Sequence, residues 1–584
     1  MRENAIRRTI GVIGAAALAL GGVLITAAPA QAADSIGSVS ELNDAIGTAN
    51  GGAAVEVELS AGFAVDEDIL PLTAGSLSIE GHGLALVGDG TSAFFDVSGT
   101  ATLAIHDLVV VTNLGGPAIT STGVPQDPAS SPTVALSAFQ ATTAEADAPF
   151  TPGSSTAVWI TDTALTVTDS YLYDSGIGLE GAFSFGESRI TRLETSGTLD
   201  CGIAIDASGT AVVEATELGI AGAGCTGLAV TTTDTASVTV ADSTIRDSAG
   251  GAQLVNGGGT IVLRDSTIAG STSEEQLVVF GAFDGTTRII GTTITGGADV
   301  GLPAVAVQGI AGAISIEHST ITRNAVDGVP VLESCSCGTG SFALDHTIVA
   351  GNIGTGASAP DVVLEGATAS WNLIGEVDPT DTVTLDILGA GVNYLDEDPQ
   401  LGPLADNGGA SETHLPATAS PVVNAGDPAF SGPPALDQRG APRVSAGIVD
   451  IGAVEVQFSP VLSLSRASGA VGDTLTVTGS GFPPSAAVAL VFNSDPVALG
   501  TVTTTGSGSL SLSTSIPTSV SAGAHTVTAS IGAAVVASAA IEVTGLPDTG
   551  SASGEHATTW LASLLLVAGI AAIAVSRRHR RATR

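Results

Sequence analysis

Carboxylate side chains recur along this sequence at turns that lie about one repeat apart. Asp242, Asp265 and Asp345 each begin such a turn, and Asp169 and Glu317 occupy comparable places. Carboxylates on neighbouring turns could act as a general acid and base on a glycan, or could bind Ca²⁺. Aspartate is also a natural turn residue, because its side chain caps its own backbone. We favour the turn explanation and keep catalysis as the alternative.

Polysaccharide lyases usually use an arginine or lysine base with calcium, and in a lyase of this sequence that base would be an arginine, because all 17 basic residues are arginine and there is no lysine. This composition excludes lysine Schiff bases, lysine general bases and lysine–asparagine crosslinks. The arginines in the central part of the chain are Arg246, Arg264 and Arg288. The catalytic alternative therefore consists of Asp242, Asp265 and Arg264.

The eight histidines are scattered along the chain. Gly81-His82-Gly83 resembles a catalytic motif of β-helix polygalacturonases, but its companion motif Arg-x-Lys cannot exist without lysine. We therefore expect His82 to lie in a turn. His318 and His346 occupy neighbouring turns and could touch, and we expect both to be solvated.

Length and composition bound the class of protein. A chain of 584 residues is long enough for several domains. Hydrophobic residues make up 44% and charged residues 13%, which is not the composition of a disordered protein. The formal charge of −41 repels phosphate, so nucleic acid is excluded as a partner. Aromatic residues, at 3%, argue against a deep aromatic ligand pocket.

The first 32 residues have the pattern of a secretory signal peptide. Three arginines precede the apolar stretch Ile10–Ile25, and Ala30-Gln31-Ala32 is a small-x-small cleavage site. We expect cleavage between Ala32 and Ala33. The alternative is an uncleaved membrane anchor, for which the apolar stretch is short.

The last 39 residues, 546–584, hold a motif, an apolar stretch and a basic tail in that order. Leu546-Pro547-Asp548-Thr549-Gly550 with the apolar residues 560–575 resembles the LPxTG sorting signal of Gram-positive surface proteins. The resemblance implies that a sortase cleaves the Thr549–Gly550 bond and joins Thr549 to peptidoglycan. The basic tail would stay cytoplasmic, so the chain would be in the membrane only before sorting. A plain C-terminal membrane anchor is the alternative.

Removal of both ends changes the charge of the chain. It leaves 9 basic and 56 acidic residues, a formal charge of −47. Such a surface is solvated and suits an exposed protein, and it disfavours acidic polymers as partners unless cations bridge them. The arginine-only usage and the bias to Ala, Gly and Thr also resemble those of a high-GC actinobacterium.

The four cysteines predict disulfides, because their number is even and an exported chain meets an oxidising compartment. Three pairings are open. Cys201 and Cys225 lie 24 residues apart, about one repeat, which favours Cys201–Cys225 and leaves Cys335–Cys337 as a tight bridge. A zinc site is the rival interpretation and would need all four to converge.

The middle of the chain repeats. Alternating apolar strands precede turns that end in isoleucine, and these isoleucines are 23, 26, 27 and 27 residues apart. Such period-2 strands at about 25 residues per repeat predict a right-handed parallel β-helix. A leucine-rich repeat is the main rival, but its leucine pattern is missing. The turns are Asp242-Ser243-Thr244-Ile245, Asp265-Ser266-Thr267-Ile268, Gly291-Thr292-Thr293-Ile294, His318-Ser319-Thr320-Ile321 and Asp345-His346-Thr347-Ile348.

The β-helix is expected to span 33–370 in about 12 coils, with a capping helix at Ser38–Ile46. Residues 371–458 contain Trp371-Asn372-Leu373-Ile374-Gly375, Asp437-Gln438-Arg439-Gly440 and Asp450-Ile451-Gly452-Ala453-Val454-Glu455. In order and spacing this segment resembles the choice-of-anchor Q domain, which ends β-helix surface proteins. The resemblance implies a surface location and no reaction.

From 459 to 545 short alternating strands separate turns. Gly479-Ser480-Gly481-Phe482-Pro483-Pro484 resembles an early turn of bacterial Ig-like modules. The segment predicts one small β-sandwich. We expect a spacer, and a ligand-binding module is the alternative.

Together these features predict an all-β protein that is secreted and anchored to the cell wall. The expected function is non-catalytic adhesion or recognition of a glycan or host surface, with no cofactor. A wall-tethered polysaccharide lyase or glycoside hydrolase on the β-helix face is the alternative, for which Ca²⁺ is the conceivable cofactor.

Overall fold

The computed structural model describes residues 34–545, apart from 89–92, 113–116, 126, 144–155, 174–176, 199–200, 282–283, 310, 336–337, 355–359 and 495. The described residues form two compact units that divide between Phe458 and Ser459. The expected signal cleavage site, the sorting motif at 546–550 and the apolar stretch at 560–575 lie outside the described residues. Within the described part, no helix is both long and apolar enough to cross a membrane.

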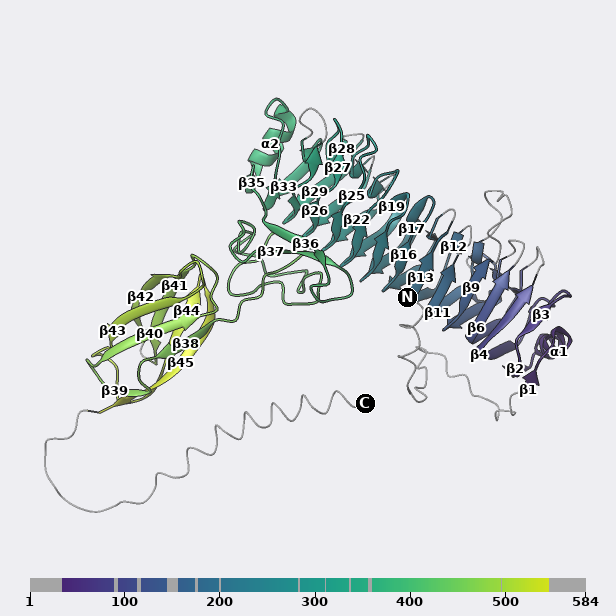
Figure 1. Cartoon of the computed structure of the whole chain (residues 1–584), viewed down its shortest axis with the longest axis horizontal. Helices are drawn as coiled ribbons and strands as arrows, with labels where there is room; N and C mark the ends of the chain where they lie inside the picture. The colour runs from purple at the N-terminus through teal and green to yellow at the C-terminus, as the bar shows by residue number, and fades with distance from the viewer. Residues whose placement is uncertain are drawn as a thin grey trace, which may run out of the picture. The chain divides into compact units, whose positions relative to one another are not determined.

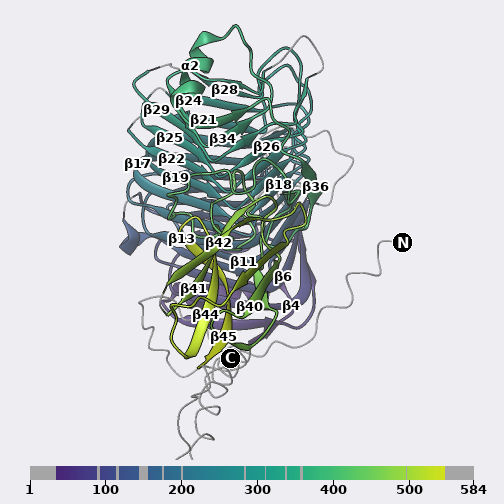
Figure 2. The ribbon, with the colours of Figure 1, turned by 90° about the vertical axis from the view of Figure 1, so that its left-hand side faces the viewer.

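The first unit is a parallel β-helix, in which strands of successive coils lie side by side (Figures 1 and 2). Each complete coil contributes to three faces. The first face is formed by β2 (Ala54–Leu59), β4 (Ser76–Gly88), β6 (Thr102–Thr112), β8 (Thr133–Ser137), β11 (Ala164–Tyr173), β13 (Glu187–Ser196), β15 (Val212–Thr216), β17 (Thr226–Ala241), β19 (Gly250–Arg264), β22 (Thr286–Ile290), β25 (Ala313–Glu317), β29 (Ser341–Asp345) and β33 (Ala367–Ser370).

The other two faces use shorter strands and the remaining halves of the long ones. The second face adds β3 (Phe63–Val65), β9 (Gln140–Thr143), β16 (Gly219–Ala221), β18 (Thr244–Arg246), β20 (Thr267–Ala269), β23 (Thr293–Thr295), β26 (Thr320–Thr322), β30 (Ile348–Val349), β34 (Asn372–Ile374) and β35 (Asn393–Leu395). The third face adds β5 (Phe95–Ser98), β7 (Ile119–Thr122), β10 (Thr156–Thr161), β12 (Ile177–Phe183), β14 (Ile203–Ala207), β21 (Leu277–Gly281), β24 (Val305–Gly309), β28 (Leu332–Cys335) and β32 (Val362–Val363).

The corner between the first and second faces has the same geometry in coil after coil. One residue in each coil adopts a left-handed conformation. At six of these corners the next residue is a buried Ser, Thr or Asn whose side chain accepts a backbone N–H from the coil before, namely Ser170, Ser243, Ser266, Ser319, Thr347 and Asn372. Leu218 N–H donates to Ser243 Oγ (3.1 Å), and Thr347 N–H donates to Asn372 Oδ1 (2.8 Å). The left-handed residues, with φ between +48° and +59°, are His82, Asp107, Ala138, Asp169, Arg192, Glu217, Asp242, Asp265, Gly291, His318, His346 and Trp371.

The left-handed conformation explains why aspartate recurs at the corners. Asp tolerates a left-handed φ better than most residues do. Asp169, Asp242 and Asp265 are corner residues. Glu317 and Asp345 instead end strands β25 and β29, one position before the corner.

The predicted register is right for four of the five repeats. Ile245, Ile268, Ile294 and Ile321 pair in one inward-facing row and are fully buried. The fifth position is wrong, because Val349 continues the row and Ile348 points to the outer side. The corner in this coil is His346, so the repeat is shifted by one residue relative to the aligned motif.

Both open ends of the β-helix are covered by a helix. α1 (Val39–Asn50) begins at the N-cap Ser38, whose side chain accepts the Glu41 N–H, and buries Leu42 and Ile46 against the first coils. The predicted capping helix is therefore confirmed, with a later end. At the other end, α2 (Thr382–Ala390) packs on β33 and has Asp381 as its N-cap.

Residues 399–456, called here the C-terminal cover, pack on the outer side of the second face. The cover contains the antiparallel pair β36 (Leu401–Ala405) and β37 (Thr413–Pro416), visible below β26 in Figure 1. Gln438 anchors it by donating to the Ser266 carbonyl (3.0 Å) and accepting from Thr293 Oγ1 (2.6 Å). The cover therefore joins residues more than 140 positions apart.

A buried network of charged residues stabilises the C-terminal cover. Its members come from the sequence motifs at 437–440 and 450–455 and from the segment between them. Arg439 pairs with Asp437 (2.7 Å), and the Ser445 and Asp450 N–H groups both donate to Glu455. Burial, together with the proximity of other carboxylates, raises the pKa of both Asp450 and Glu455. These acids have a structural role in the cover.

The second unit consists of two sheets around one hydrophobic cluster that includes Phe482, Phe492 and Val527. All its strand pairs are antiparallel except that of β39 (Ser468–Ala470) with β45 (Ala534–Thr544). The Ig-like identity of this unit stays a prediction. One sheet holds β38 (Val461–Leu464), β40 (Thr474–Ser480) and β43 (Leu510–Ser515), and the other β39 (Ser468–Ala470), β45 (Ala534–Thr544), β44 (Gly523–Ile531), β41 (Ala487–Asn493) and β42 (Val497–Thr503).

Candidate functional site

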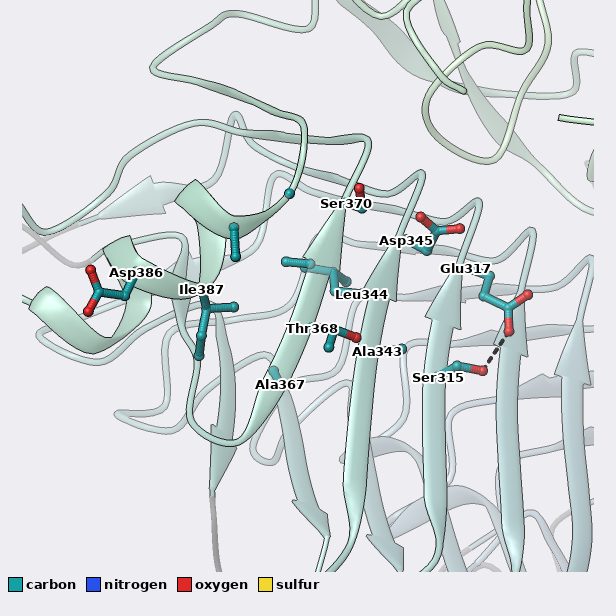
Figure 3. A pocket seen from close by; sticks show the side chains of 13 residues that line it. Ser315, Glu317, Ala343, Leu344, Asp345, Ala367, Thr368, Ser370, Asp386 and Ile387 are labelled. Atoms are coloured by element: carbon teal, nitrogen blue, oxygen red, sulfur yellow. Dashed lines mark hydrogen bonds between the residues drawn. The ribbon is translucent and has the colours of Figure 1, made fainter. Parts of the chain in front are cut away.

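A cavity of about 610 Å³ lies between the outer side of the first face and α2, and is called here the sheet groove (Figure 3). Its lining is mostly small and apolar, and its carboxylates stand at the strand ends and on α2. It is lined by Ser315, Glu317, Ala343, Leu344, Asp345, Ala367, Thr368, Ala369, Ser370, Asp386, Ile387, Ala390 and Gly391.

The strand alternation positions these side chains in rows. Ser315, Ala343 and Thr368 are cross-strand neighbours on β25, β29 and β33, and their small volumes leave the space above the sheet empty. Gly391 closes the end of α2 against the last coil, where a Cβ would collide with the Ala369 carbonyl. The groove therefore needs small residues on the floor and glycine at the wall.

A second row carries the charge of the sheet groove. Glu317, Asp345 and Ser370 are neighbours at the ends of the same three strands, as Figure 3 shows. Burial of Glu317 is outweighed by hydrogen bonds from Arg288 (2.7 Å) and Ser315 (2.6 Å), so its pKa is lowered. Glu317 is thus held as an acceptor for hydrogen bonds rather than as a proton donor.

A smaller, more polar cavity of about 370 Å³, the corner groove, lies at the corner between the first and second faces, beside Ala410 of the cover. Arg192 donates to both carboxylate oxygens of Asp169, which lowers the pKa of Asp169. Nearby Glu194 raises the pKa of Tyr171, and burial raises that of Tyr173 to about 12. The corner groove is lined by Asp169, Tyr171, Arg192, Glu194, Glu217, Leu218, Gly219, Asp242, Thr244 and Ala410.

The structure places the predicted catalytic residues at successive corners. Asp242 lines the corner groove, whereas Asp265 is held by Arg264 (2.6 Å). Burial raises the pKa of Asp265 despite this arginine. Ser411 of the cover donates to the Asp265 carbonyl (3.0 Å), so the cover reaches this corner. Asp242 and Asp265 are therefore neighbours, and of the two only Asp242 lines the corner groove.

The histidine prediction was wrong about solvation. His318 and His346 do touch, with ring centroids 4.6 Å apart, but both are buried beneath the cover. Arg443 donates to His318 Nδ1 (3.2 Å), and the Asp427 N–H donates to His346 Nε2 (2.9 Å). Burial, Arg443 and His346 lower the pKa of His318. Sequence reasoning missed this because the covering residues are about 80 to 125 positions away.

His82 lies at a left-handed corner, as predicted for a turn, with Glu58 and Glu80 at 3.8 Å. The sulfur atoms of Cys201 and Cys225 are 3.6 Å apart, an unbonded distance, so their predicted disulfide stays a prediction. Cys335 is disulfide-bonded, and Cys337 lies outside the described residues.

The described residues contain no cluster of three or more His, Cys, Asp or Glu that could hold a metal ion. The repeated acids are spread over successive coils, and Asp169, Asp265 and Glu317 are each paired with an arginine.

No family model and no curated protein matches the chain. Among solved structures it is similar to a mutant of a periplasmic alginate epimerase, at 10% identity and a TM-score of 0.30, over 54% of this chain and 77% of that one. It is also similar to tailspike protein 3 of bacteriophage CBA120, at 13% identity and a TM-score of 0.32, over 62% and 57% of the two chains. At these values the likenesses add nothing about function.

Proposed function

We propose that this chain is a secreted surface protein that is anchored to the cell wall and binds a glycan in the sheet groove without cleaving it. The observation that carries the proposal is an open cavity with a mostly apolar lining and a row of acceptors on one side. A pyranose ring has apolar C–H faces and a rim of hydroxyls, so it complements both surfaces.

The charge of the groove restricts the glycan. Glu317 and Asp345 lie side by side at its polar edge, and Asp386 lines the opposite wall. The whole chain carries −41. A uronic acid would be repelled, so a neutral, hydroxyl-rich oligosaccharide is the expected ligand.

The proposed location of the protein rests on its sequence motifs. The signal peptide, the motif Leu546-Pro547-Asp548-Thr549-Gly550 and the apolar stretch 560–575 support export, cleavage by a sortase and attachment of Thr549 to peptidoglycan. The likeness of 371–458 to the choice-of-anchor Q domain supports a surface location. The unit at 459–545 would then serve as an Ig-like spacer.

The test is a glycan array probed with the Ala33–Thr549 fragment, which contains every described residue, with release of reducing ends measured on each glycan that binds. Binding of neutral glycans without release is the expected result. A fragment that binds none of them would contradict the proposal, and release of reducing ends would show an enzyme.

The second candidate function is glycan cleavage at Asp242, Asp265 and Arg264. It is favoured by one observation, the raised pKa of Asp265, which is caused first by burial and to a smaller extent by the nearby Asp242. Glycosidases separate the pKa values of two carboxyls in this way. Any turnover should disappear in Asp265→Asn while thermal stability is kept, and activity that survives this change would eliminate the assignment.

A further inference from the structure

Trp159 stands on the outer side of the third face, on a different part of the β-helix from the sheet groove. Its side chain is 50% exposed on β10. Among the described Trp, Tyr and Phe residues, it alone is exposed. An indole in water gains free energy when a ligand covers it, so this position offers a ligand a stacking surface.

The cross-strand neighbours of Trp159 are polar and define what that partner is. Glu180 on β12 is its direct neighbour on one side and Thr120 on β7 on the other. Asp96 on β5 is the next cross-strand neighbour beyond Thr120 and accepts a hydrogen bond from the Thr120 hydroxyl (3.0 Å). Rungs are about 4.8 Å apart, so one carboxylate lies beside the indole and another two rungs away. Trp159, Glu180, Thr120 and Asp96 are called here the Trp159 platform.

The field of the platform is negative. Its two charged members are both carboxylates, and they lie on a chain of formal charge −41. A cation over an indole face is attracted by the ring, and adjacent carboxylates add to that attraction. An acidic sugar would be repelled, and a neutral sugar would gain the stacking energy alone.

We propose that the Trp159 platform binds the ammonium-bearing pyranose of an amino-sugar oligosaccharide. The C–H face of the ring stacks on Trp159, and the ammonium group lies between the indole and Glu180. This site is on another face from the sheet groove and does not depend on the function proposed for that groove.

The probe is a glucosamine hexamer, titrated calorimetrically into the Ala33–Thr549 fragment. We expect saturable binding that weakens as NaCl is raised, because the ammonium contacts are screened. Trp159→Ala should lower the affinity at least about tenfold. Gln253→Ala, an exposed position four rungs further along the same row, is the matched control and should bind as the unchanged chain does.

The N-acetylglucosamine hexamer separates charge from stacking, because it has the same ring without the ammonium group. It should bind at least about tenfold more weakly than the glucosamine hexamer. Equal binding of the two hexamers, or unchanged binding by Trp159→Ala, would overturn the proposal. Ala343→Phe in the sheet groove should leave this titration unchanged, so failure of the two sites can be told apart.

Discussion

At the scale of single residues, the sheet groove is defined by what its floor lacks. Ser315, Ala343 and Thr368 lie in one outward row on three adjacent strands. Their small side chains create the cavity, and Glu317 is fixed beside them by Arg288. A single large side chain in this row should therefore close the groove without touching the core.

Ala343→Phe is the first test. Because Ala343 faces outward, the new ring should fill the cavity and lower glycan affinity by at least about tenfold, or 1.4 kcal/mol, with little change in stability. Thr239→Phe is the matched control, since it lies in the same row four rungs before Ala343, outside the groove. Equal affinity of the two variants in calorimetric titration would contradict the assignment of the groove.

At the scale of elements, the coils depend on the alternation of inward and outward side chains. Leu263 of β19 is fully buried, whereas Val262 beside it is on the outer side. The two neighbouring positions of one strand thus have opposite environments.

Leu263→Asp should destabilise the β-helix by about 3 kcal/mol or more, because it buries a charge without a partner. Val262→Asp places the same carboxylate outside, near Arg288 on the next strand, and should change stability by less than about 1 kcal/mol. Thermal unfolding of both variants measures this, and similar melting temperatures would show that the register is wrong.

The cover adds a pH dependence at the element scale. Burial, then Arg443 and His346, lower the pKa of His318 below its ordinary 6.5. Below about pH 6.5 the unfolded chain therefore binds a proton that the folded chain does not, so this group makes stability fall as the pH falls, by up to about 1.4 kcal/mol per pH unit. The raised pKa values of Asp450 and Glu455 act in the opposite direction.

His318→Asn isolates the histidine contribution, because asparagine tolerates the left-handed conformation and does not titrate. The loss of melting temperature between pH 7 and pH 5 should be smaller in this variant than in the unchanged chain. An identical loss in both proteins would mean that His318 is not buried in its neutral form.

At the scale of the whole molecule, the two folded units lie between segments whose motifs concern export and attachment. The motif at 546–550 comes directly after residue 545, the last described residue of the second unit. In the proposed function, display of the β-helix outside the cell depends on these two terminal segments.

Thr549→Ala tests attachment. A sortase that recognises the Thr549–Gly550 bond should no longer cleave it, so the protein should stay in the membrane fraction instead of being released from the wall by muralytic enzymes. A folded variant that is still released with the wall fraction would contradict sortase attachment.

The sequence by itself determined the β-helix, its N-terminal cap and the approximate repeat, because inward-facing rows such as Ile245, Ile268 and Ile294 depend on local alternation and nearly constant spacing. Local pattern also identified Asp242 and Asp265 as turn residues. It placed Ile348 wrongly. This repeat is longer by one residue, so the sequence motif still looks the same, but the Ile348 side chain faces the outer side of the sheet and Val349 takes the inward position.

Only the tertiary structure decided where cavities lie and which polar residues are buried. The sheet groove requires α2 to stand beside β33, and the burial of His318 requires Arg443 of the cover, 125 residues later, to pack over it. The indole of Trp159 stays exposed because no segment of the described chain covers that part of the third face. Such contacts depend on the path of the chain in space, and residue types along one strand do not encode that path.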